Sequence, residues 1–83
     1  MNAKDMRNTN SVSLIYAYKV ALDKEEYLLC KAIKEELAER KNAGELNNEV
    51  IDATIQAYDV HGNSYRDMQY EVFHEMLEEI KIL

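Results

Sequence analysis

The chain contains no proline, no tryptophan and only two glycines among its 83 residues. Proline and glycine interrupt helices and populate tight turns, so their scarcity argues against a fold of many short strands and turns. With 47% hydrophobic residues, the chain can instead form long helices that each bury one face. We therefore predict an all-α protein.

Only one cysteine is present, Cys30, so no internal disulfide can form and nothing indicates an oxidising compartment. No stretch approaches the roughly 18 apolar residues that a membrane-spanning helix needs, and the first residues lack the apolar run of a signal peptide. We expect a cytoplasmic protein that does not enter membranes. Residues 1–10 are polar and aperiodic, which is typical of a flexible leader, and residues 11–83 are expected to form one helical domain.

The hydrophobic periodicity predicts three to four helices in a small antiparallel bundle. At 83 residues a single core is only marginally sufficient, so a dimer of this bundle is a second expectation. Capping chemistry sets the expected bounds, because Asp23 and either Asn47 or Asn48 can begin helices and Gly44 can end one. The predicted helices span residues 12–22, 24–41, 48–60 and 64–82.

Residues 11–22 leave two alternatives open. As a strand, the segment alternates well, with five apolar residues from Val12 to Val20 on one side. As a helix, it places Val12, Ile15 and Leu22 on one stripe, and we favour this alternative because a lone strand has no second strand in this chain to pair with. A strand would need a partner chain, as in the ribbon-helix-helix fold, and would make the protein a DNA-binding regulator.

The last predicted helix has a core side and an acidic side. Its apolar stripe consists of Tyr65, Met68, Val72, Met76, Ile80 and Leu83, widened by Phe73. The opposite face carries Asp67, Glu71, Glu75 and Glu78. Their spacings of four, four and three residues stack side chains along one helix face. Because the apolar arc is wide, we expect this helix to be buried on more than one side, by the other helices together or by a second chain.

Negative charge is concentrated in the second half. Residues 1–41 carry eight Lys/Arg and seven Asp/Glu, a net charge of +1, whereas residues 42–83 carry two and nine, a net charge of −7. A surface of this sign repels nucleic acid and anionic membranes and attracts a basic protein surface. The lysines of the first half are interleaved with glutamates, so we expect no direct nucleic-acid binding there either. The candidate partner-binding residues are Asp52, Asp59, Asp67, Glu71, Glu75 and Glu78.

The chain has six tyrosines, more than the predicted core stripes can bury. Tyrosine is enriched in interfaces because it brings a large contact area at a modest entropic cost. Exposed apolar residues would then form a protein-binding or dimer surface, so a self-associating structural module is the second functional hypothesis. The apolar interface candidates are Tyr16, Tyr18, Tyr27, Leu28, Tyr70 and Leu77.

Few residues have the chemistry for catalysis or metal binding. Cys30 shares the apolar stripe of residues 29–37, where a cysteine acts as a small core residue rather than as a nucleophile. Glu71 and His74 match the Glu-x-x-His pair of di-iron bundles, but both lie on or beside the acidic face, away from a bundle interior. His61 is expected to satisfy carbonyls at a helix end. We predict no enzymatic activity, no bound metal and no cofactor.

Together these observations predict a non-enzymatic helical module that docks its acidic C-terminal half on a basic protein surface, such as the nucleic-acid groove of a partner. An inhibitor, an antitoxin or an immunity protein would act in this way, through electrostatic steering and occlusion. In style, though not in any motif, the chain resembles the small accessory proteins of phages and mobile elements that bind one host protein. That resemblance implies a phage accessory role with a single protein partner.

Overall fold

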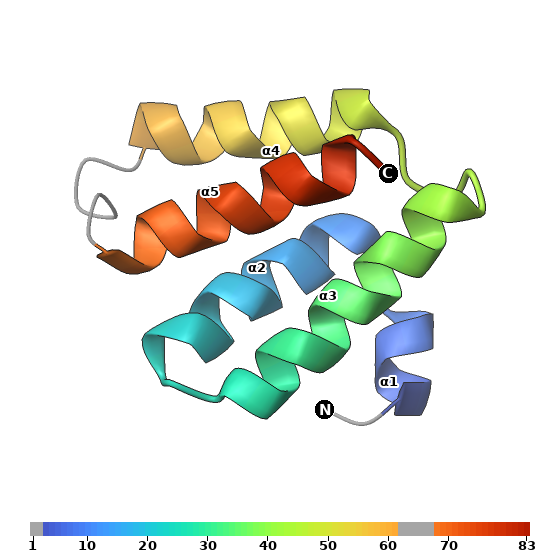
Figure 1. The fold of residues 1–83 in the computed structure, drawn as a ribbon, viewed down its shortest axis with the longest axis horizontal. Coiled ribbons are helices and arrows are strands. Elements are labelled where there is room, and N and C mark those ends of the chain that lie inside the picture. The colour runs from blue at the N-terminus through green and yellow to red at the C-terminus, as the bar shows by residue number, and fades with distance from the viewer. Residues whose placement is uncertain (1–2, 62–67) are drawn as a thin grey trace.

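The computed structural model describes residues 3–61 and 68–83, which form five α-helices and contain no strand. The helices are α1 (Ala3–Asn8), α2 (Ser11–Asp23), α3 (Tyr27–Asn42), α4 (Asn48–His61) and α5 (Met68–Lys81) (Figure 1). The predicted all-α class is confirmed, as are the helices predicted at residues 12–22 and 48–60. Residues 64–67 of the last predicted helix lie outside the described residues. None of the described helices combines the length and apolarity that crossing a membrane requires.

The N-terminal segment differs from the predicted leader, because Ala3–Asn8 form helix α1. This helix packs against α3, and its Met6 side chain is only 7% exposed and belongs to the core. A helix with only one large apolar residue produces no clear periodicity, so the sequence pattern does not reveal it. The fold therefore extends closer to the N-terminus than the predicted domain at residues 11–83.

Residues 11–23 are helical, so the strand alternative is wrong, and the condition for a ribbon-helix-helix fold is not met. The side-chain Oδ1 of Asn10 accepts a hydrogen bond from the backbone N–H of Ser13 at 2.8 Å, which caps the start of α2. Asn47 caps α4 in the same way, by accepting from the backbone N–H of Val50 at 3.0 Å. The cap predicted for α4 is therefore confirmed at Asn47.

Asp23 does not cap α3, although its sequence position suggests that it would. It is the last residue of α2, and its carboxylate accepts a hydrogen bond from Nζ of Lys19 at 2.6 Å. The chain then turns through Glu25, whose φ is +60°, and the backbone N–H of Glu26 donates to the carbonyl of Ala21 at 2.8 Å. This bond satisfies a carbonyl at the end of α2, and α3 begins at residue 27 rather than at residue 24.

The end of α3 follows the prediction. Gly44 has a φ of +78°, and the backbone N–H of Glu45 donates to the carbonyl of Arg40 at 2.8 Å. A second bond joins the N–H of Gly44 to the carbonyl of Lys41 at 3.2 Å. These two bonds form a Schellman motif, in which glycine is preferred because its φ is positive.

Helices α2 and α3 form an antiparallel pair, and α5 lies against α2, α3 and α4 (Figure 1). Helix α4 packs mainly on α5, on the side away from the α2–α3 pair, and α1 packs on α3. The expectation that the last helix is buried on more than one side is therefore confirmed, and the other helices of the chain supply the contacts.

The core lies where α2, α3, α4 and α5 meet. The largest fully buried side chains are Phe73, Leu14, Ile15, Ile33, Leu37, Ile51, Leu77 and Ile80. On α5 this core face is rotated from the predicted stripe, because Val72 and Leu83 are exposed whereas Leu77 is 1% exposed. The rotation follows because α5 packs against α2, α3 and α4 together, and these helices cover a different arc of α5 than a single apolar stripe predicts.

Candidate protein-interaction site

Three glutamates form an exposed acidic row along α5. Glu71, Glu75 and Glu78 lie on the face opposite the buried Phe73 and Leu77, with successive carboxylates about one helical turn apart. We call Glu71, Glu75 and Glu78 the acid stripe. Neither Glu71 nor Glu75 forms an ion pair with any described residue. Their charges therefore face solvent, and no cation among the described residues pairs with them.

His74 borders the acid stripe. Its Nε2 lies 3.8 Å from Oε1 of Glu78, and its ring lies 6.0 Å from the ring of Tyr70. A shallow hollow is lined by Tyr70, Glu71, His74 and Glu75. Over residues 3–61 and 68–83, no three His, Cys, Asp or Glu side chains are grouped so that they could hold a metal ion. The Glu-x-x-His pair therefore lies at the edge of an acidic surface, outside the bundle core.

Asp52, which the prediction also includes, and Glu79, which it does not, are both offset by lysines. Asp52 on α4 pairs with Lys81 on α5, with 2.6 Å between Oδ1 and Nζ, and this hydrogen bond raises the pKa of the lysine. Glu79 on α5 pairs with Lys34 on α3. The ion pairs thus narrow the predicted acid face to the outermost line of α5.

Three predicted site residues fall beyond what the structure describes. The side chain of Asp59 and the whole of Asp67 lie outside the described residues, and so does the side chain of His61, the predicted helix cap. The acid stripe is accordingly defined by its three described glutamates alone.

The six apolar interface candidates divide into two groups. Tyr16, Tyr27 and Leu28 are exposed and Tyr70 is half-buried, whereas Tyr18 and Leu77 belong to the core. Tyr18 packs near Phe73 of α5, with 6.3 Å between ring centroids. The prediction is therefore wrong for Tyr18 and Leu77, because both lie in the core that the helices form together, on sides that a single-helix pattern leaves exposed.

A groove lies between α3 and α5, and the sequence does not predict it. Its floor is formed by the buried side chains of Tyr18, Leu22 and Cys30, its α3 wall by Tyr27, Lys31 and Lys34, and its α5 wall by Gln69 and Val72. The cavity volume is about 570 Å³. The whole of α4 separates the two walls in the sequence, so no local pattern indicates that they face each other. We call this space the α3–α5 groove.

The floor of the α3–α5 groove keeps its titratable groups neutral. Burial raises the pKa of the Cys30 thiol, and the nearby Glu26 carboxylate acts in the same direction. Burial also raises the pKa of the Tyr18 hydroxyl, with smaller contributions from Cys30 and Glu79. The Cys30 Sγ lies 3.9 Å from the carbonyl of Tyr18, to which the thiol donates a weak hydrogen bond. A protonated, buried thiol packs as an apolar group and is a poor nucleophile, as its stripe predicts.

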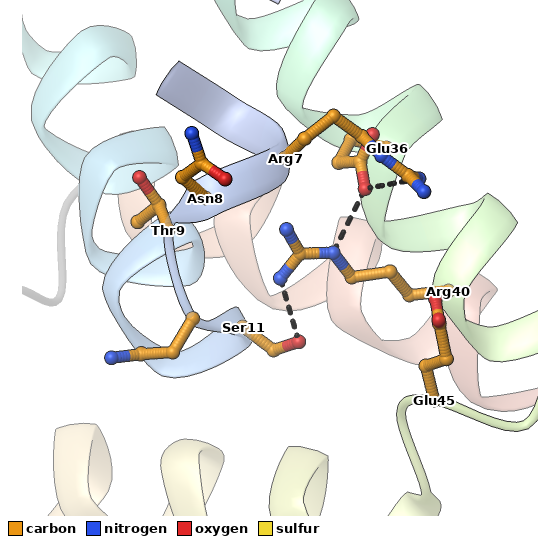
Figure 2. A pocket seen from close by; sticks show the side chains of 8 residues that line it. Arg7, Asn8, Thr9, Ser11, Glu36, Arg40 and Glu45 are labelled. Atoms are coloured by element: carbon orange, nitrogen blue, oxygen red, sulfur yellow. Dashed lines mark hydrogen bonds and ion pairs between the residues drawn. The ribbon is translucent and has the colours of Figure 1, made fainter. Parts of the chain in front are cut away.

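A second hollow, at the junction of α1, α2 and α3, is built around Arg40 (Figure 2). Its guanidinium donates to Oε2 of Glu36 at 2.8 Å, to the hydroxyl of Ser11 at 3.1 Å and to the carbonyl of Met6 at 2.7 Å. Arg7 approaches the same Glu36 oxygen at 3.3 Å. The sequence predicts only the Glu36–Arg40 pair, from its i,i+4 spacing. Because these donors are engaged within the protein, we interpret the cluster as a structural joint between three helices.

No protein-family model matches the chain, no curated protein sequence matches it significantly, and no solved structure matches its fold at a significant level. The functional evidence therefore lies in the residues of the site themselves. Its two prominent features are the acid stripe and the α3–α5 groove, which share α5.

Proposed function

We propose that this protein is a non-enzymatic binding module that docks the acid stripe of α5 on a basic surface of a protein partner. The observation that carries the proposal is that Glu71 and Glu75 are exposed without an ion-pair partner among the described residues. On the two flanks of α5, ion pairs offset the charges: Lys34 of α3 pairs with Glu79, and Lys81 pairs with Asp52 of α4. On α5, the carboxylates that no Lys or Arg of the described residues offsets are thereby confined to one narrow line.

Physical chemistry supports a docking role for such a line. The backbone that carries these charges belongs to a helix that packs against three others, so it needs no reordering when a partner arrives and no backbone entropy is lost on binding. A row of like charges also steers an oppositely charged surface during diffusional encounter. Ile82, at the C-terminal end of the same face, is 84% exposed and can add apolar contact area.

The partner class that fits this chemistry is a protein with a basic groove or patch, as a nucleic-acid-binding protein has. Occupying such a groove would block its ligand, which is how an inhibitor, an antitoxin, an immunity protein or a phage accessory protein acts. The proposed function includes a cytoplasmic location for the protein.

The test reverses two charges of the stripe in the variant Glu71→Lys/Glu78→Lys. The matched control, Glu35→Lys/Glu45→Lys, makes the same change in net charge at two exposed positions outside α5. A partner captured from the native cell and then purified should bind the first variant about tenfold or more weakly than wild type at low salt. It should bind the control nearly as well as wild type.

Salt dependence provides the second measurement. Wild-type affinity should fall as ionic strength rises, because exposed charges are screened over about 8 Å at physiological salt. The Glu71→Lys/Glu78→Lys variant should lose most of this dependence. Equal affinities and equal salt slopes for wild type and this variant would contradict the proposal.

A further inference from the structure

The α3–α5 groove opens beyond the ion pair that joins its two walls. Lys34 of α3 and Glu79 of α5 form this pair, and about one turn earlier on each helix lie Lys31 and Glu75. Both residues are exposed, and neither forms an ion pair with a described residue. Lys31 lines the α3 wall of the groove, and Glu75 lies on α5 between the groove residue Val72 and Glu79. The groove rim therefore carries a cation and an anion that have no ion-pair partner among the described residues.

Between these charges lies apolar surface. Tyr27 on the α3 wall is 57% exposed, and Val72 on the α5 wall is 42% exposed. Docking of another chain over the groove would remove both from water, which favours association because apolar surface is then no longer hydrated. The site therefore combines an apolar centre with a charged rim, as specific interfaces do.

The charges of the rim decide which occupant fits. An acidic segment would pair with Lys31 but would be repelled by Glu75, and a basic segment would pair with Glu75 but would be repelled by Lys31. A second copy of the chain satisfies both residues. A two-fold axis that runs along the groove mouth places α3 of each copy over α5 of the other, so the two complementary contacts form together.

We propose that the α3–α5 groove is a homodimer interface, in which Lys31 of each copy pairs with the partner's Glu75 around the side chains of Tyr27 and Val72. This inference gives a specific surface to the self-association that the sequence offers as an alternative function. It shares Glu75 with the acid stripe, so dimerisation and partner docking compete for that residue. Their tests remain distinct, because Glu71→Lys/Glu78→Lys leaves both Lys31 and Glu75 unchanged.

The test uses single charge reversals, with mass measured by sedimentation equilibrium. Wild type should be dimeric at protein concentrations of about 10–100 μM, which bracket a typical weak homodimer. In Lys31→Glu, two carboxylates face each other at both contacts, and in Glu75→Lys two ammonium groups do so. Each variant alone should dimerise at least about tenfold more weakly than wild type.

Mixing the two variants distinguishes the proposed pairing from a general effect of charge. In the mixed dimer, the carboxylate introduced by K31E in one chain faces the ammonium group introduced by E75K in the other, and the remaining contact pairs Lys31 with Glu75. A one-to-one mixture of K31E and E75K should therefore recover wild-type dimerisation, as should the double variant K31E/E75K. Circular dichroism spectra that match the wild-type spectrum serve as the control that every variant is folded.

Control variants separate this proposal from the previous one. Lys4→Glu and Glu45→Lys make equal charge changes at exposed positions outside the groove, and each should dimerise as wild type does. Glu78→Lys should also leave the dimer intact. A monomeric wild type at the highest concentration, or a mixture that stays monomeric, would overturn the homodimer proposal.

Discussion

Arg40 and Glu36 are each only 8% exposed, so each charge depends on the other for its stability in the fold. Arg40→Met would remove the cation and leave Glu36 with Arg7 alone, at 3.3 Å. We expect the free energy of unfolding to fall by about 3 kcal/mol. Urea unfolding, with an unchanged denaturant slope, measures this loss.

The double variant Glu36→Leu/Arg40→Met serves as the control for that prediction. It removes both buried charges and replaces them with apolar groups, so it should be clearly more stable than Arg40→Met alone. If the double variant were as unstable as the single one, an uncompensated carboxylate would not be the cause of the loss.

The same residues show how far sequence reasoning extends. The spacing of Glu36 and Arg40 predicts their pair, because residues four apart share a helix face. It does not predict that the pair is buried, because Ser11 and Met6, which complete it, lie 29 and 34 residues away from Arg40. Contacts at such separations depend on how helices cross, and no local pattern contains that information.

The turn after α2 and the turn after α3 each contain one residue with a positive φ, but that residue differs between them. Gly44 has a φ of +78° and Glu25 a φ of +60°, a region that glycine tolerates and residues with a Cβ avoid. No atom lies within 4 Å of the position that a Cβ on Gly44 would take, so Gly44→Ala tests the backbone alone. It should destabilise the protein by about 1 kcal/mol in thermal or urea unfolding.

Glu25→Gly should have the opposite effect. Glycine removes the Cβ strain at the end of α2 while keeping the turn, so stability should rise by about 0.5 kcal/mol after its larger unfolded-state entropy is subtracted. A loss of stability in Glu25→Gly would show that the Glu25 side chain makes a contribution larger than its strain.

Among the helices, the periodic and capped ones are the predictable ones. The bounds of α2 and α4 follow from apolar spacing and an asparagine cap, and the end of α3 follows from Gly44. On α5, the observed core face is rotated about the helix axis from the predicted one, since Val72 is exposed and Leu77 is buried. A helical wheel shows which face is apolar, but it does not show on which flank the neighbouring helices lie.

For the whole molecule, three titratable groups with raised pKa values predict how stability responds to alkaline pH. The pKa of Cys30 is raised above 9.0 and that of Tyr18 above 10.0, chiefly by burial. The pKa of Lys81 is raised above 10.5 by its hydrogen bond to Asp52. In each case the folded state holds its proton more tightly than the unfolded state does.

The direction of the effect follows from proton linkage. Well below pH 9 these groups are protonated in both states and add no pH dependence, whereas as the pH rises through their ordinary pKa values the unfolded chain loses protons first. Stability should therefore fall as pH rises above about 9, measured by urea unfolding at successive pH values. In Cys30→Ala the decline should begin about one pH unit higher, near the ordinary pKa of tyrosine. Stability that is constant from pH 8 to pH 11 would contradict the prediction.

The groove and the acid stripe differ in how well the sequence predicts them. The stripe is local to one helix, so its spacing alone predicts Glu71, Glu75 and Glu78. The groove is lined by residues of α2, α3 and α5 that lie far apart in the sequence, so it is a property of the assembled bundle.

Arg40 of α3 donates a hydrogen bond to the carbonyl of Met6, so helix α1 depends on the folded α3 for its stability. Six residues are too few to sustain a helix in water, because the cost of nucleation exceeds the gain from so few backbone bonds. Arg40 supplies a cation near the C-terminal end of α1, where helix carbonyls lack partners within the helix. An isolated peptide of residues 1–10 is accordingly a coil, and a spectroscopic label in α1 would report when α3 folds or unfolds.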